Sequence, residues 1–273
     1  MMYIMKTKLV MLIRNYRPVL ILVCVLLFIL DCDQPEFSQP VVTGRVAKTL
    51  NPESNTAFIL VGTVTVKNLL NEKWLETPDP EDTAFWANPF PAEVTPMANA
   101  EVKINDQPIT YKAAGIYFQA GMDLEYLHRY ELTIATPDRA TITAYGFLPD
   151  SFSILLPQER DSLRYGIDTL KAVWTKSDSA HFYLVAVPPA DSASPAIGWN
   201  DAIQDTTCII PFTAFQDTLG NPVSGEYLFS VTAVNGGWKK GALDLFFSGG
   251  NLKGALGTFG CAFATWPRRI LVR

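Results

Sequence analysis

The sequence predicts an all-β protein, with two β-sandwich domains that follow an N-terminal export segment. Three observations support this fold class: short runs in which apolar residues alternate with period two, turn residues between those runs, and a scarcity of runs with helical periodicity. A hydrophobic content of 48% with 18% charged residues excludes a disordered chain. The 273 residues are enough for two domains of ordinary size behind a short leader.

The first 31 residues have the layout of an export signal. Four basic residues, the last of them Arg14 and Arg17, precede an uncharged run over residues 19–30. As a helix this run reaches about 18 Å, which is shorter than the ~30 Å hydrocarbon layer of a bilayer. The pattern therefore favours a signal core over a stable transmembrane helix.

Cys32 lies where a bacterial lipoprotein signal is cut, and the stretch Ile29-Leu30-Asp31-Cys32 resembles a lipobox. Ile29 matches the aliphatic position of that motif, whereas Asp31 stands where the family has a small residue. Residues 32–40 are polar and contain proline, which is typical of a tether between a membrane and a folded body. The resemblance implies lipid attachment at Cys32, with an uncleaved signal anchor and simple secretion as the alternatives.

Residues 41–157 are expected to form the first sandwich. One strand, expected to pack on one face only, begins at Phe58, and residues 101–111 predict a hairpin that turns at Asn105-Asp106. Residues 129–136 place Tyr130, Leu132 and Ile134 on one face and polar residues on the other, which is the pattern of a strand packed on one side. Two further strands are expected within residues 140–157.

A charged stretch without alternation, residues 157–165, marks the expected boundary with a second domain over residues 158–273. There, Trp174 shares a strand face with Leu170 and Ala172. A later strand, "GEYLFSVTAVN", alternates apolar residues from Tyr227. An inward tryptophan followed by a tyrosine-led strand resembles the second and sixth strands of a fibronectin type III sandwich, over residues 161–273.

The closing segment is rich in glycine, at positions 249, 250, 254, 257 and 260. Such density predicts bulges or close backbone approach, followed by a closing strand at 269–272. The stretch Asn251, Gly254, Gly257, Phe259, Gly260 also resembles the ending of a Bacteroidota family of exported lipoproteins of unknown function. That resemblance implies a transthyretin-like β-domain followed by a fibronectin-like one, located at the cell envelope.

A long excursion at residues 68–97 interrupts the first sandwich. It carries five prolines and the large aromatic residues Trp74, Phe85, Trp86 and Phe90. Long loops inside compact domains tend to be functional, and indole and phenyl faces supply contact area at small entropic cost. These four residues are the candidate ligand or partner site. In the alternative interpretation they fold back to cover an edge of the first sandwich or to bridge the two domains.

The sequence predicts no catalytic residues, no metal site and no cofactor. Its two histidines, His128 and His181, lack zinc-hydrolase spacing, and no Gly-x-Ser-x-Gly elbow occurs. An acidic cluster at residues 79–82 matches no calcium loop. Cys208 and Cys261 either pair as a disulfide, as exported proteins allow, or remain two buried thiols.

A formal charge of −5 makes nucleic acid a poor partner, because an acidic surface repels phosphate. From the export signal, Cys32 and the missing catalytic motifs, we expect a cell-envelope lipoprotein, anchored in the outer membrane, that acts as a non-catalytic binding or interaction module. The family resemblance implies an accessory role beside an outer-membrane receptor or transporter, and the aromatic loop makes a glycan another candidate partner. The alternatives are a structural or adhesive envelope protein with spacer domains and, third, an envelope carbohydrate-active enzyme.

Overall fold

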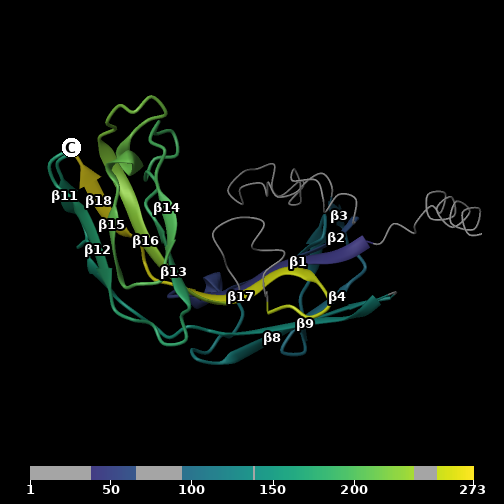
Figure 1. The fold of residues 1–273 in the computed structure, drawn as a ribbon. Coiled ribbons are helices and arrows are strands. Elements are labelled where there is room, and N and C mark those ends of the chain that lie inside the picture. The colour runs from purple at the N-terminus through teal and green to yellow at the C-terminus, as the bar shows by residue number, and fades with distance from the viewer. Residues whose placement is uncertain (1–37, 66–93, 138, 237–250) are drawn as a thin grey trace, which may run out of the picture. The chain divides into compact units, whose positions relative to one another are not determined.

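The computed structural model describes residues 38–65, 94–137, 139–236 and 251–273, and within them the all-β prediction is confirmed (Figure 1). Strands are joined by turns and by short 3₁₀ helices, among them η1 (Pro52–Ser54) and η3 (Phe212–Phe215). The predicted signal segment, 1–31, lies outside the described residues, as does most of the predicted tether. Residues 38–40, the end of that tether, already belong to the first strand.

Three sheets make up the described body. The strands of the largest are β1 (Ser38–Thr49), β2 (Thr56–Thr65), β3 (Val94–Pro96), β6 (Tyr111–Ala113), β7 (Ile116–Ala120), β11 (Asp161–Leu163), β13 (Phe182–Ala186), β14 (Asn200–Ile203), β16 (Gly225–Gly236), β17 (Leu256–Ala264) and β18 (Arg268–Val272). Their main order is β11-β18-β16-β17-β1-β2-β7-β6, with β3 on β2, β13 on β16 and β14 on β13. One sheet thus contains strands from both expected domains.

Two smaller sheets complete the sandwiches. The first has the order β5-β4-β8-β9 and comprises β4 (Glu101–Ile104), β5 (Gln107–Pro108), β8 (Arg129–Thr136) and β9 (Arg139–Phe147). The second has the order β10-β12-β15 and comprises β10 (Ile154–Leu156), β12 (Leu170–Trp174) and β15 (Thr207–Ile210). The closing strand expected at 269–272 is confirmed as β18.

The first core is built by the alternation that the sequence predicts. Tyr130, Leu132 and Ile134 of β8 are buried at 5%, 0% and 0% exposure, while Arg129 and Glu131 remain exposed. These side chains pack with apolar residues of β1, β2, β4 and β9 into one cluster. The period-two pattern therefore predicted the buried face of β8 correctly.

The predicted hairpin forms between β4 and β5, where Ile104 pairs with Gln107. Asn105 and Asp106 both adopt positive φ, 45° and 65°, as the tight turns that match strand twist require. The return strand is shorter than expected, because Tyr111 belongs to β6 and pairs with β7 instead.

The strand from Phe58 differs from the expectation of one-sided packing. In β2, Ile59 and Val61 enter the first core, whereas Leu60 and Val64 enter a separate cluster on the opposite face. On this second face Leu60 and Val64 pack against Val41 of β1, Val94 of β3 and Ile116 of β7, so both faces of β2 are buried.

The second core lies between the β10-β12-β15 sheet and β13, β16 and β18. Trp174 is buried at 2% exposure on the same face as Leu170 and Ala172, as expected. Tyr227 and Phe229 of β16 are buried at 1% and 0%, so the inward face of the tyrosine-led strand is also confirmed. The structure gives these strands no family assignment, and the fibronectin-like and transthyretin-like types stay predictions.

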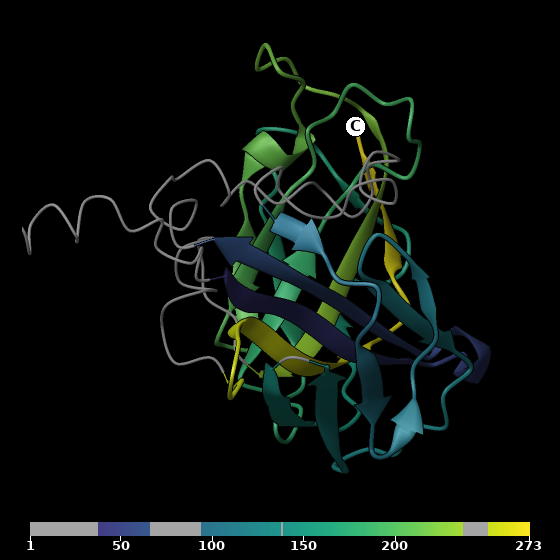
Figure 2. The ribbon, with the colours of Figure 1, turned by 90° about the vertical axis from the view of Figure 1, so that its right-hand side faces the viewer.

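Strand β17 joins the two cores, and the views agree on its place beside β1 (Figures 1 and 2). It pairs parallel with β1, from Val41 opposite Leu256 to Thr49 opposite Ala264, and antiparallel with β16. Its Phe259 and Cys261 belong to the first core and its Phe263 to the second. A segment from the C-terminal end of the chain thereby completes the first sandwich.

The close backbone approach predicted for this segment is confirmed at Gly257 and Gly260, whereas Gly249 and Gly250 lie outside the described residues. A Cβ on Gly257, whose φ is +113°, would lie 1.9 Å from the carbonyl oxygen of Val42. A Cβ on Gly260 would lie 2.9 Å from the carbonyl oxygen of Asn235. Only glycine lets β17 fit between β1 and β16 at these two positions. The boundary proposed between residues 157 and 158 stays a prediction.

Candidate functional site

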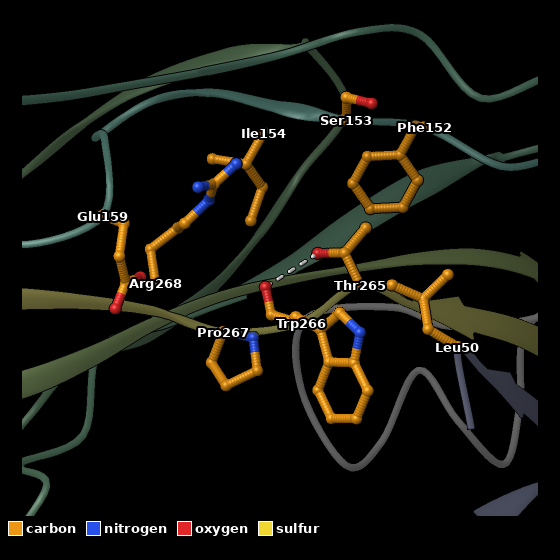
Figure 3. A pocket seen from close by; sticks show the side chains of 9 residues that line it. All are labelled: Leu50, Phe152, Ser153, Ile154, Glu159, Thr265, Trp266, Pro267 and Arg268. Atoms are coloured by element: carbon orange, nitrogen blue, oxygen red, sulfur yellow. Dashed lines mark hydrogen bonds between the residues drawn. The ribbon is translucent and has the colours of Figure 1, made fainter.

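A pocket of about 290 Å³ opens where the chain leaves β1, enters β10 and passes from β17 to β18 (Figure 3). Four chain segments contribute to it, and its wall mixes apolar, hydroxyl and charged side chains. The lining residues are Leu50, Phe152, Ser153, Ile154, Glu159, Thr265, Trp266, Pro267 and Arg268.

The apolar base of the pocket is held by the second core. Phe152 and Ile154 are buried, at 7% and 5% exposure. The Phe152 ring packs edge-on against Phe263, with centroids 5.7 Å apart, and against Tyr183 at 5.8 Å. Because these rings are fixed by packing on two sides, the base is preorganised before any ligand arrives.

Trp266 is the most unusual residue of the pocket, because its side chain is 63% exposed. It lies in the short connection between β17 and β18, immediately before Pro267, and proline restricts the preceding residue to extended conformations. Leu50, at 47% exposure, lines the same pocket. A large indole left in water beside a second exposed apolar side chain is typical of an interaction site.

The pocket also carries one carboxylate and one guanidinium. The Glu159 carboxylate accepts a hydrogen bond from the backbone N–H of Arg269, at 3.0 Å, through Oε2. Among the described residues no ion pair engages the Arg268 guanidinium, whereas Arg269 pairs with Glu226 at 3.0 Å. Figure 3 shows Glu159 and Arg268 on one side, Leu50 on the other and the indole of Trp266 between them.

This set of side chains is suited to binding. It offers a flat aromatic surface, apolar neighbours, a donor fork and a partly used carboxylate. The lining contributes a single carboxylate, whereas hydrolysis of glycosides usually requires two across a cleft. Trp266 was not among the residues predicted from sequence, although a tryptophan followed by proline between two strands is a signal for an exposed loop aromatic.

Of the site residues predicted from sequence, the structure describes only Cys208 and Cys261, and neither lines this pocket. Cys32 and the aromatic residues Trp74, Phe85, Trp86 and Phe90 lie outside the described residues, so both assignments stay predictions. Of the excursion 68–97, only residues 94–97 are described. There β3 pairs with β2, and the carbonyl of Met97 accepts a hydrogen bond from the Tyr117 hydroxyl at 3.0 Å.

The disulfide that the sequence left open is not formed, and both cysteines are free thiols. The reason is their placement. Cys261 is buried in the first core, and Cys208 packs half-buried against the second. Burial raises the pKa of Cys208 to about 11 and also raises the pKa of Cys261. Both are therefore protonated and unreactive near neutral pH.

The two histidines make structural contacts. His181 lies 3.3 Å from Gly236 N through Nδ1 and 3.3 Å from the Asn235 amide nitrogen through Nε2. His128 stacks edge-on with Tyr130, with centroids 5.2 Å apart. Within the described ranges, no group of three or more His, Cys, Asp or Glu side chains is placed to hold a metal ion.

A scan against protein-family models and a search of curated proteins returned no match to this chain. Within the part of the chain that the structure describes, no helix has the length and apolar character needed to cross a bilayer.

Proposed function

We propose that the protein is a lipid-anchored binding module of the cell envelope, without catalytic activity, and that its ligand site is the Trp266 pocket. One observation carries the proposal: Trp266, which is 63% exposed, lines the same pocket as the buried Phe152 and as Arg268, whose guanidinium has no ion pair among the described residues. Exposed indole costs solvation free energy in the free protein, and a bound partner recovers it.

The anchoring part of the proposal rests on the sequence. A basic region, a short apolar core and Cys32 come in the order of a lipoprotein signal. Strand β1 begins at Ser38, so a lipid on Cys32 holds the body within about 20 Å of the membrane surface. Several acyl chains make such an attachment effectively permanent. The outer membrane and an accessory role beside a receptor or transporter follow from the family resemblance proposed above.

Fatty-acid labelling tests the anchor. Cells that produce the full chain are fed an alkyne-tagged fatty acid, and the protein is captured, coupled to a dye and separated from the envelope fraction. Wild type is expected to carry the label, and Cys32→Ala is expected to lose it. Cys24→Ala is the matched control and keeps the label. An unlabelled wild-type chain with an intact N-terminus overturns the anchor.

Affinity purification from mildly solubilised envelopes tests the pocket. The wild-type chain is compared with Trp266→Ala and with Leu219→Ala, a control whose side chain is 85% exposed and lies outside the pocket lining. The expected result is an envelope component that wild type and Leu219→Ala retain and Trp266→Ala loses. Equal recovery by all three chains removes the pocket from the proposal, and recovery of no component by any of them favours a spacer role.

A further inference from the structure

We infer that the Trp266 pocket recognises a neutral pyranose unit of a glycan. The inference rests on the proposed binding function and specifies the ligand class of the same site. Three features carry it: the exposed indole, the two charged groups beside it and the small size of the pocket.

The indole supplies the face of the site. A pyranose ring in its chair form presents axial C–H groups on one side, and these polarised hydrogens are attracted to the negative face of an aromatic ring. Trp266 has the largest such face available to a side chain, and among the described residues no other ring packs on it. Leu50 and Phe152 add apolar surface around the same opening.

The charged groups supply the edge of the site. Sugar hydroxyls both donate and accept, so neighbouring hydroxyls can donate to the Glu159 carboxylate and accept from the Arg268 guanidinium. Glu159 is already held in place by the backbone N–H of Arg269, at 3.0 Å through Oε2. An apolar side chain from a partner protein satisfies neither group, and it desolvates both at a cost.

The volume of the pocket and the charges near it narrow the class of ligand further. A pocket of about 290 Å³ lies at the small end of ligand sites, which suits one sugar ring with its neighbours outside. The Glu159 carboxylate and the formal charge of −5 disfavour uronates and other anionic sugars. The expected ligand is therefore a neutral hexose unit, carried by a free polysaccharide or by a lipid-linked one.

The test uses the full-length protein in a detergent without a sugar headgroup. Saturation-transfer NMR and titration calorimetry measure binding of a panel of neutral methyl pyranosides and their short oligomers. At least one of these is expected to bind. Trp266→Ala is expected to weaken that binding at least tenfold, Trp266→Phe less, and Arg268→Met several-fold. Tyr145→Ala, which removes an exposed aromatic outside the pocket lining, is the matched control and is expected to bind as wild type does. Circular dichroism verifies that each variant is folded.

The outcomes separate this inference from the proposed function. If no pyranoside binds up to 10 mM, roughly the weakest single-sugar affinity of interest, while envelope capture still depends on Trp266, the glycan is wrong and the binding module stands. The same conclusion follows if the pocket captures a receptor polypeptide and free peptides, but not sugars, compete with that capture. If neither sugars nor envelope components distinguish Trp266→Ala from wild type, both fail. If a pyranoside does bind, comparing free oligosaccharides with glycolipid micelles identifies whether a free or a lipid-linked polysaccharide supplies the sugar ring.

Discussion

The side-chain oxygen of Asn235 accepts a hydrogen bond from the backbone N–H of Phe147, at 2.9 Å, and so ties β16 to the end of β9. The amide nitrogen of the same residue donates to the carbonyl of Ser179. Asn235 is only 5% exposed, so one buried amide links three segments that are far apart in sequence. It stands where the strands of the two cores meet, since its pairing partner on β17 is Cys261.

Replacing Asn235 by alanine is expected to lower the free energy of unfolding by about 1 to 3 kcal/mol, because the backbone N–H of Phe147 and the carbonyl of Ser179 lose their partly buried hydrogen bonds. Urea unfolding followed by circular dichroism measures this change. Asn200→Ala, at an exposed position of β14, is the control and is expected to change stability by less than about 0.5 kcal/mol. Equal effects of the two substitutions would contradict the linking role.

Gly257→Ala is expected to prevent β17 from pairing with β1. The added Cβ meets the Val42 carbonyl oxygen at 1.9 Å, so the parallel pair must separate, at a cost of about 3 kcal/mol or more. Gly166→Ala is a matched control, since Gly166 also has positive φ, +72°, but no atom within 4 Å of its Cβ position. Thermal unfolding distinguishes clash from backbone strain, and a clash requires a much larger loss for Gly257→Ala.

A fragment of residues 38–157, the first expected sandwich, is not expected to fold alone. It lacks β17, so its core loses Phe259 and Cys261, and β1 presents an unpaired edge. Loss of a buried phenylalanine alone costs about 3 to 5 kcal/mol, a large share of domain stability. Amide NMR spectra test this, and a well-dispersed spectrum of the isolated fragment would show that β17 is dispensable.

Cys208 is expected to react slowly with alkylating reagents. With a pKa of about 11 its thiolate fraction at pH 8 is roughly a hundredfold below that of an ordinary cysteine. Cys261, buried in the first core, is expected to react only after unfolding. Site-resolved mass spectrometry after timed iodoacetamide labelling, with and without urea, measures both. Rapid native labelling of Cys261 would contradict its placement.

Stability is expected to fall in alkaline solution. The folded-state pKa of Cys208 is raised, so above the unfolded value, about 8.5, the unfolded chain binds fewer protons than the folded one. The free energy of unfolding therefore decreases as pH rises between about 9 and 11. Urea unfolding across this range is expected to show a shallower decrease for Cys208→Ala than for wild type. Part of the decrease is expected to remain in Cys208→Ala, because burial also raises the pKa values of Tyr117 and Tyr130.

Local patterns predicted the strands well, because the alternation of apolar and polar residues within a strand indicates which face is buried. Tyr130, Leu132 and Ile134 needed no knowledge of the neighbouring strand to be placed on the buried side. The turn at Asn105-Asp106 was predictable for the same reason, since these residues tolerate positive φ. The same reasoning underestimated the burial of β2, because its second face is covered by side chains of the strands that flank it, and local alternation does not show which strands these are.

The candidate site was not predicted, because its parts come from four separate segments. Glu159, Trp266 and Arg268 have no common motif, and they meet only once β18 pairs with β11 and β16. The aromatic residues around Trp86 are dense enough in the sequence to indicate a site, whereas a single tryptophan between two strands gives a much weaker signal.

The sequence by itself determined the strand content, the inward faces and the need for glycine in the closing segment, since these depend on side-chain size, alternation and backbone freedom along a few neighbouring residues. The tertiary structure alone decided that this glycine-rich segment pairs with the first strand of the body and separates two cores that share one sheet. Parallel pairing between distant segments has no local signature, because its hydrogen bonds and buried contacts exist only after the whole chain has closed on itself.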